Sequence, residues 1–566
     1  MPHATSPNPG LQVFILCGPG ESLSTFTSNP KDFSKALIPI ANRPMVWYPI
    51  DWCCRMGITD IVLITPPESQ PALQSALVTH PALTSLPIRK LEILAPRDLT
   101  QTTGTGALLR LPEVQSAITS DFVILPCDLI SELDGIKLIQ RWMELSPINN
   151  SHRSTTNQLT HKGGLGVYYP TAGLDDISHK KDETDFIATT KLQTSGTVSL
   201  SGRLHLEKLV IAMPTDTMRD KLEEHEEFFK VRTALQQKVG QVDIKTKHRD
   251  AHVYIFPIWV KKFVAKNETF DSISEDVMGW WAKAQWQDGL GDKLSMEEAL
   301  NPKKTTKDDL ADSSHLEEDD TAGLTPLSTT KVSLPLRCAV QKTAAFASRV
   351  ANAASTAIQP APLVIPPLMA YVQPSRYQPT PARDSPLIRR VDNSHALLSV
   401  SLYLAKQPTT HTLSHENKVH PTVRLGQQSR VAQEDCLIAE NTIVGFRSII
   451  KESVIGMNCE IGNNVRLTKC LLMDGVTICD GAQLTGCIIG RRARVESLPT
   501  ATELPSAEKG KTRPEDDDDR TRLTECEVAP YFKVESGTEA KGEKFSSFDT
   551  AELYDDDEEY QEEDED

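Results

Sequence analysis

The chemistry this sequence comes closest to is phosphate binding by a glycine turn. Gly18 and Gly20 directly follow the apolar run 12–17, and nucleotides commonly dock at such a turn where it ends a buried strand. A Gly-x-Gly turn alone is more often only a tight bend, because glycine is the default residue where φ must be positive. The next residues are Glu21 and Ser22, so the turn has the outline of a phosphate loop without its cation.

The segment after this loop carries a resemblance. Residues 34–48 include Lys-x-Leu-x-Pro-x-x-Asn-x-Pro-Met, which together with the loop resembles the nucleotide-sugar pyrophosphorylase (nucleotidyltransferase) family. The matching positions are Lys35, Leu37, Pro39, Asn42, Pro44 and Met45. In the family pattern a threonine stands where this chain has Glu21, and an arginine where it has Ser22. Without a guanidinium to stabilise the departing pyrophosphate, the resemblance implies a site that no longer turns over.

Two further positions belong to the same resemblance. Asp128 ends the apolar run 121–127 and is similar to the family aspartate that holds magnesium, although an aspartate at a strand end can also simply cap a turn. His252, in Asp-Ala-His-Val-Tyr, stands where the family has a glycine facing the sugar, and its side chain would crowd that pocket. We therefore predict a vestigial nucleotide pocket at Gly18, Gly20, Lys35 and Asp128, with no catalytic residue, metal site or cofactor assigned.

The elements that position these residues alternate between strands and helices over 11–290. Short apolar runs predict strands near 12–17, 60–65, 91–94, 121–126, 164–169 and 252–256, and helical patterns fall near 45–57, 69–79, 103–111 and 133–143. Such alternation predicts a Rossmann-like α/β domain with a mostly parallel sheet. The Trp280, Trp281 and Trp286 cluster is interpreted as a helix packing on that sheet rather than as an aromatic binding platform.

A second architecture follows a connector. Residues 291–385 are first polar and then proline-rich, which predicts a flexible insert and an extended linker. Residues 386–490 are expected to form a further connector and then a second domain, because eight apolar residues recur there at a step of six: Val431, Leu437, Ile443, Ile449, Ile455, Ile461, Leu467 and Met473. This hexapeptide repeat predicts a left-handed parallel β-helix ending near Gly490, with a register shift near Ile478. We expect residues 491–566 to form an acidic, disordered tail.

Charge, hydropathy and cysteine content indicate which kinds of partner and compartment to expect for this chain. The 566 residues carry a net charge of −17, of which −11 falls in residues 551–566, so direct nucleic-acid binding is not expected. No run approaches about 20 apolar residues and no leader pattern opens the chain, which favours the cytosol and argues against a membrane. The 11 cysteines lack Cys-x-x-Cys pairs and are expected to be small core residues.

Three functions fit a transferase domain joined to a hexapeptide coil. An active nucleotide-sugar pyrophosphorylase, similar to mannose-1-phosphate guanylyltransferase, is opposed by Glu21, Ser22 and His252. A hexapeptide acyltransferase would need a histidine base, and no histidine follows His420. The third is a non-catalytic descendant: over about 11–290 and 385–490, the chain resembles the gamma-subunit family of eukaryotic translation initiation factor 2B.

That resemblance implies a non-catalytic scaffold or regulatory subunit of a guanine-nucleotide exchange factor. Its partners would be the other subunits of initiation factor 2B, chiefly epsilon, and the GTPase initiation factor 2, which is recycled from its GDP to its GTP form. About 76 residues follow Gly490, without helical periodicity, which favours gamma over epsilon with its helical exchange domain. The sequence leaves open which surface meets epsilon, whether the pocket binds a nucleotide, the copy number, and the roles of 291–335 and the tail.

Overall fold

A nine-stranded sheet forms the centre of the N-terminal part of the molecule. The computed structural model describes residues 8–88, 90–100, 102–145, 161–171, 184–192, 204–224, 228–229, 231–301, 363–374, 386–497 and 520–546. In order across the sheet, the strands are β5 (Lys90–Leu94), β4 (Asp60–Ile64), β1 (Gln12–Leu16), β6 (Phe122–Pro126), β11 (Asp243–Phe256), β8 (Gly164–Pro170), β12 (Leu368–Val372), β10 (Glu207–Pro214) and β9 (Asp185–Lys191).

The two halves of this sheet differ in strand direction. From β5 to β6 all neighbours are parallel, as the sequence predicts. Beyond β6, β11 runs antiparallel to both β6 and β8, and only β8 and β12 are parallel. β11 also pairs with β9, the strand at the far edge of the sheet. This half of the sheet therefore curls back on itself. The parallel half brings the ends of β1 and β6 together, where the glycine loop and Asp128 follow.

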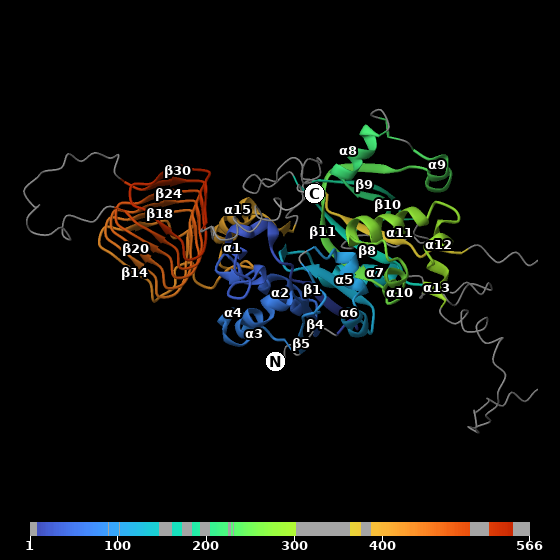
Figure 1. Cartoon of the computed structure of the whole chain (residues 1–566), viewed down its shortest axis with the longest axis horizontal. Helices are drawn as coiled ribbons and strands as arrows, with labels where there is room; N and C mark the ends of the chain where they lie inside the picture. The colour runs from blue at the N-terminus through green and yellow to red at the C-terminus, as the bar shows by residue number, and fades with distance from the viewer. Residues whose placement is uncertain are drawn as a thin grey trace, which may run out of the picture.

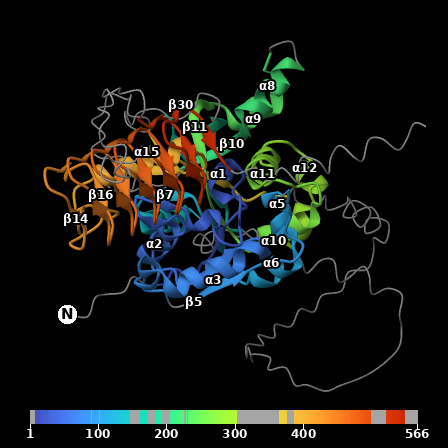
Figure 2. The same ribbon diagram turned by 60° about the vertical axis from the view of Figure 1, so that its left-hand side comes forward.

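Helices cover both faces of the sheet (Figure 1). Because successive side chains of a strand point to opposite faces, Val13 and Ile15 belong to one apolar core and Phe14 to the other. The helices are α1 (Ser24–Thr27), α2 (Trp47–Arg55), α3 (Gln70–Thr79), α4 (Pro81–Thr84), α5 (Thr105–Arg110), α6 (Pro112–Ala117), α7 (Gly135–Leu145), α8 (Thr215–Glu223), α9 (Thr233–Val239), α10 (Trp259–Lys266), α11 (Met278–Ala284), α12 (Leu290–Lys293), α13 (Met296–Leu300) and α15 (Ser394–Lys406). Helices α8 and α9 project away from α3 (Figure 2).

The C-terminal part is a left-handed parallel β-helix with three faces, each a six-stranded parallel sheet. The first face holds β14 (Arg424–Leu425), β17 (Ile443–Val444), β20 (Glu460–Ile461), β23 (Thr477–Ile478), β26 (Arg494–Val495) and β29 (Lys533–Val534). The second holds β15 (Arg430–Val431), β18 (Ile449–Lys451), β21 (Arg466–Thr468), β24 (Gln483–Thr485), β27 (Arg522–Thr524) and β30 (Glu539–Lys541). The third holds β16 (Leu437–Ile438), β19 (Val454–Ile455), β22 (Leu471–Leu472), β25 (Ile488–Ile489), β28 (Glu527–Val528) and β31 (Lys544–Phe545).

The register of six predicted from the sequence is wrong in detail. Equivalent residues of successive coils, such as Leu437, Val454 and Leu471, lie 17 positions apart rather than 18. The interior is therefore filled at steps of six, six and five, for example by Ile438, Val444, Ile450 and Ile455. One corner of each coil is a residue shorter, and there a left-handed residue such as Glu452 (φ 44°) or Lys469 (φ 55°) closes the turn. Leu437, Ile443, Ile449 and Met473 consequently lie outside the coil's interior core.

Two predicted domain limits are also wrong. Residues 368–372, within the expected linker, form β12 inside the sheet. The β-helix does not end near Gly490, because β26 to β31 add strands as far as Phe545. Residues 498–519 and 547–566, which hold the acidic runs, and the alanine-rich 336–358 lie outside the described residues.

The β-helix is packed directly on the α/β domain. Leu437, Val454, Leu471 and Ile488 point outward from its third face and belong to the same apolar core as Ile40, Ala41 and Met45. Helix α15 contacts β2 (Pro39–Ile40), β19 and β22 and so fills the space between the two parts. Among the described residues, no helix combines the length and apolar character needed to cross a membrane.

Candidate nucleotide site

The glycine loop turns the chain sharply after β1. Gly20 has φ 92°, in the left-handed region, and a Cβ built there would lie 2.9 Å from Thr27 Cγ2 and 3.0 Å from Lys35 Cβ. Thr27 Oγ1 donates a hydrogen bond to the Gly20 carbonyl at 3.0 Å. A short 3₁₀ turn, η1 (Glu21–Leu23), follows, and its Glu21 and Ser22 side chains are exposed. Glycine at position 20 is thus required by both conformation and space.

The structure brings Lys35 and Asp128 into contact. Lys35 Nζ lies 2.8 Å from Asp128 Oδ2, and the aspartate side chain is only 1% exposed. A second cation reaches the same carboxylate: Arg390 Nε lies 3.2 Å from Oδ1 and Nη2 lies 3.4 Å from Oδ2. Arg390 is carried by β13 (Ile388–Arg390), which pairs antiparallel with β7 (Leu129–Ser131), the strand directly after Asp128. Asp128 is therefore neutralised from two sides by this chain's own residues.

The ion pairs extend beyond Asp128 as an alternating series. Arg390 Nη2 lies 3.9 Å from Asp392 Oδ2, and Arg249 binds the same carboxylate through both Nη atoms at 3.3 and 2.5 Å. Burial opposes ionisation of Asp128, but Arg390 and Lys35 outweigh it and hold the pKa of that carboxyl well below its usual range. Ionised, the carboxylate has the oxygens that magnesium prefers, but a metal ion there would have to compete with Lys35 and Arg390.

A second pair of carboxylates borders this network. The Asp250 amide donates to Asp185 Oδ2 at 2.6 Å, and Asp250 Oδ2 accepts from the Tyr254 hydroxyl at 2.7 Å. Burial, followed by the charge of Asp185, raises the pKa of Asp250 to about 7. Asp185 begins β9, whereas Asp250 and Tyr254 lie at the two ends of the irregular part of β11, where its register with β8 shifts.

His252 lies in that irregular segment with φ 52°, a left-handed conformation. Burial and the nearby Arg390 lower the pKa of its imidazole. Left-handed backbone costs a residue with a Cβ about 1–2 kcal/mol, so glycine would be the least strained residue at this position. The histidine here keeps the conformation and adds a ring beside Tyr254, with ring centroids 6.1 Å apart.

The Asn-x-Pro-Met segment contacts the β-helix and the segment that precedes its first strand. Asn42, with φ 62°, donates from Nδ2 to the Ile455 carbonyl at 2.8 Å. Arg43 donates to the carbonyls of Leu413 and Ser414 at 2.8 and 2.9 Å. His415 Nε2 lies 2.6 Å from the Ala41 carbonyl, and burial together with Arg43 lowers the pKa of this histidine to about 4. In this chain the motif joins two domains.

Comparison with known proteins agrees with this architecture. Residues 414–502 match the family model described as the EIF2B subunit epsilon LbH domain. Over 280 residues the chain is 26% identical to translation initiation factor eIF2B subunit gamma of Schizosaccharomyces pombe, which covers 49% of this chain and 52% of that protein. The chain is similar to eIF2B gamma subunits.

Other relatives match shorter segments. The eIF2B subunit gamma of Caenorhabditis elegans is 30% identical over 130 residues, 23% of this chain and 30% of that protein. A glucose-1-phosphate thymidylyltransferase of Neisseria gonorrhoeae is 35% identical over 65 residues, 12% of this chain and 22% of that enzyme. The chain therefore spans about half or less of the length of the eIF2B gamma subunits it matches.

The structure shows where the residues of the predicted pocket lie. It brings Lys35 and Asp128 together and places Gly20 against Lys35, while a Cβ built at Gly18 would meet no atom within 4 Å. Sequence reasoning missed Arg390, which falls 262 positions after Asp128 in a segment expected to be a connector. The paired arginines at 389 and 390 ahead of Asp392 were the only signal, and such a charge cluster is usually a solvated face.

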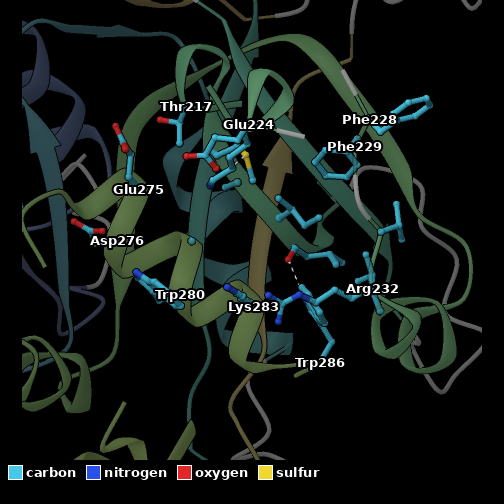
Figure 3. Close-up of a pocket in the computed structure, with 18 residues that line it drawn as sticks. Thr217, Glu224, Phe228, Phe229, Arg232, Glu275, Asp276, Trp280, Lys283 and Trp286 are labelled. Carbon is cyan, nitrogen blue, oxygen red and sulfur yellow. Dashed lines mark hydrogen bonds between the residues drawn. The ribbon is translucent and has the colours of Figure 1, made fainter. Parts of the chain in front are cut away.

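A separate cavity of about 600 Å³ lies between β10, α8 and α11 (Figure 3). Trp280, Lys283 and Trp286 line one side of it, and Phe228 and Phe229 come from another segment. Trp281 is fully buried on the sheet, as predicted for the tryptophan cluster, whereas Trp280 is 36% exposed and faces this cavity. Burial, and then the charges of Arg232 and Lys221, lower the pKa of Lys283.

Proposed function

We propose that this chain is a non-catalytic subunit of the exchange factor that recycles translation initiation factor 2 from its GDP to its GTP form. It would act with the epsilon subunit, holding that subunit in place and contributing surface that grips the GTPase. The observation that carries the proposal is that the Asp128 carboxylate is already occupied by two cations of this chain. Its carboxylate is paired with Lys35 at 2.8 Å and with Arg390 at 3.2 Å, which leaves the lysine and aspartate of the ancestral pocket engaged with each other.

The similarity to eIF2B gamma subunits and to the epsilon LbH domain supports the same assignment. So does the loop, where exposed Glu21 and Ser22 stand in place of a threonine and an arginine. A carboxylate near a triphosphate repels it by about 4 kcal/mol per charge pair at 4 Å and an effective dielectric of 20. In this proposal the exchange rate rises because the assembled surface favours a nucleotide-weak state of the GTPase.

Affinity purification of the tagged full chain from its native cytosol tests the assignment. We expect recovery of the other initiation factor 2B subunits, epsilon foremost, and faster GDP release from initiation factor 2 with the chain and epsilon than with epsilon alone. Recovery of a homo-oligomer that forms pyrophosphate from a sugar 1-phosphate and a nucleoside triphosphate would overturn it. That result would favour the pyrophosphorylase alternative, which the match to glucose-1-phosphate thymidylyltransferase keeps open for testing.

The vestigial pocket at Gly18, Gly20, Lys35 and Asp128 is a separate part of the proposal. Calorimetric titration of the full chain with magnesium and purine nucleotides measures whether it still binds. If no heat is measured at millimolar ligand, the hypothesis that the pocket binds a nucleotide is rejected. The double variant Glu21→Thr, Ser22→Arg restores the family loop, and we expect no pyrophosphorylase turnover from it because Arg390 still holds Asp128. Adding Arg390→Gln to it tests whether that contact is the remaining block.

A further inference from the structure

An unusual concentration of arginine lies on the solvent-facing strands of the first β-helix coils. Ile449 on β18 is directly opposite Arg430 on β15 and Arg466 on β21, so an apolar side chain sits between two cations on one outward row. On the neighbouring face, Ile443 lies between Arg424 and the exposed Glu460, so the arginine concentration is greatest around Ile449. Among the described residues, Arg424, Arg430 and Arg466 take part in no ion pair. The chain as a whole has a net charge of −17. Because these arginines have no acidic partner within the described residues, an anionic segment would bind them favourably.

The same surface also exposes apolar side chains. Ile443 and Phe446 are each 45% exposed, and Ile449 is half-buried. A shallow hollow lined in part by Gln428, Arg430, Arg447 and Ile449 lies beside them. We name Arg424, Arg430, Arg466, Ile443, Phe446 and Ile449 the arginine-rimmed patch. An apolar centre with arginines around it fits a segment in which aromatic and acidic residues alternate closely.

This chain contains such a segment. Residues 548–566 begin with Phe548 and include Tyr554 and Tyr560, and eleven acidic residues fall within 551–566. Tyr554 is followed at once by Asp555, Asp556 and Asp557. Strands in one face are about 4.8 Å apart, so a ring resting on Ile449 would have carboxylates within reach of Arg430 on one side and Arg466 on the other.

The geometry of the coil permits the contact within one molecule. The last strand, β31, ends at Phe545, and the third face places five strand steps between β31 and β16, about 24 Å at ~4.8 Å each. Residues 546–560 cover about 50 Å when extended at ~3.3 Å per residue. In Figure 1, β14 and β30 mark opposite ends of the coil, so the segment would run back along its length. Tethering also supplies an effective concentration in the millimolar range.

We propose that the arginine-rimmed patch binds the acidic, aromatic-containing segment 548–566 of the same chain. In the free subunit this contact would cover the patch. It rests on residues remote from Lys35 and Asp128, so it stands or falls independently of the pocket and of the exchange-factor assignment.

Cleavage of the full chain by a glutamate-specific protease tests this contact, with release of fragments from 548–566 followed by mass spectrometry. At low ionic strength we expect the segment to be cut roughly fivefold more slowly in the wild type than in Arg430→Gln, Arg466→Gln, since tethering holds it on the patch. The matched control, Lys262→Gln with Lys293→Gln, removes two exposed cations from α10 and α12 and should behave as the wild type. In ~0.5 M salt the difference should vanish, because surface charges are screened within a few ångströms.

A second variant leaves the β-helix untouched. Changing Tyr554 to Ser and Asp555, Asp556 and Asp557 to Asn in the full chain should accelerate cleavage at the remaining glutamates to the rate of the arginine variant. Equal cleavage of the wild type and both variants at low salt would overturn the proposal. So would protection confined to the acidic run 515–519, or protection that grows with protein concentration, which would indicate a second copy as the partner.

Discussion

At the scale of single residues, Asp128 shows how a buried carboxylate is stabilised by two cations of the same chain. Lys35 and Arg390 both bind its carboxylate in a nearly solvent-free position. Such a charge is tolerated only because it is paired and hydrogen-bonded, since removal of one partner leaves buried charge uncompensated. The identity of position 128 is therefore explained by folding energetics as well as by any ancestral role.

Replacing Arg390 by Gln should destabilise the fold by about 1.5–3 kcal/mol, the usual value of a hydrogen bond to a charged group. Asp128 has a depressed folded pKa, so its contribution is complete above its unfolded pKa near ~3.9 and is lost as the pH falls through the folded value. Urea denaturation at pH 7 measures the cost. In an Asp128→Asn background the same replacement should cost clearly less, and equal costs in both backgrounds would show that the two residues are not coupled.

Asp250 should show the opposite dependence on pH. Its folded pKa is raised to about 7, so between pH ~4 and ~7 the folded state binds more protons than the unfolded state, and stability falls as the pH rises. Asp250→Asn removes this loss. The stability of the variant relative to the wild type should therefore increase by up to about 1.4 kcal/mol per pH unit in that window. Urea midpoints at pH 5, 6 and 7 provide the test, and a constant difference would contradict it.

At the scale of elements, the pairing of β11 with β8 is irregular around His252, and the backbone of His252 is left-handed there. His252→Gly should be more stable than His252→Ala by about 1 kcal/mol, because only glycine adopts this backbone without strain. Both variants lose the imidazole, so their comparison isolates the backbone. Thermal denaturation of the pair is sufficient, and an alanine variant as stable as the glycine variant would show that the backbone relaxes.

The faces of the β-helix differ in what covers them. Leu471 is fully buried against the α/β domain, whereas Ile443 is 45% exposed on another face. Leu471→Ala should cost about 2–4 kcal/mol and Ile443→Ala less than ~1 kcal/mol, since only the first leaves a cavity. Urea denaturation of both variants compares two large aliphatic positions on one coil. Similar costs would mean that the interface contributes little.

At the scale of the whole molecule, the shared apolar core predicts that the two domains unfold together. All 7 tryptophans lie in residues 47–286 and report on the α/β domain, while Cys470 and Cys487 are buried in the β-helix. Tryptophan fluorescence and alkylation of these two thiols should give the same denaturation midpoint. Leu471→Asp places a charge in the interface and should separate the two midpoints. Distinct midpoints in the wild type would show independent domains.

Much of the fold was predictable from the sequence because it depends on local patterns. Alternating apolar runs gave the strands β1, β4, β5 and β6, and a repeat near six residues gave the coil. The missed elements carry similar patterns, an apolar run at 368–372 and further inward residues at Leu523, Val528 and Val534, but each lies beyond a long interruption of the regular sequence. β12 is carried by residues 368–372 after a long polar and proline-rich stretch, and the last β-helix strands follow the acidic insertion 498–519. The local sequence of these segments does not indicate which strand each of them will pair with.

The sequence by itself determined the order of the two architectures, the glycine loop, and the presence of Glu21 and Ser22 rather than a cation directly after that loop. These follow from residue types at short spacing, where backbone geometry leaves few choices. Only the tertiary structure decided that Asp128 is held by Arg390, that Asn42 serves the interdomain contact, and that the coil turns in 17 residues. Pairing between residues hundreds of positions apart depends on how complete elements pack, and a one-residue shorter corner changes which side chains face inward in every coil.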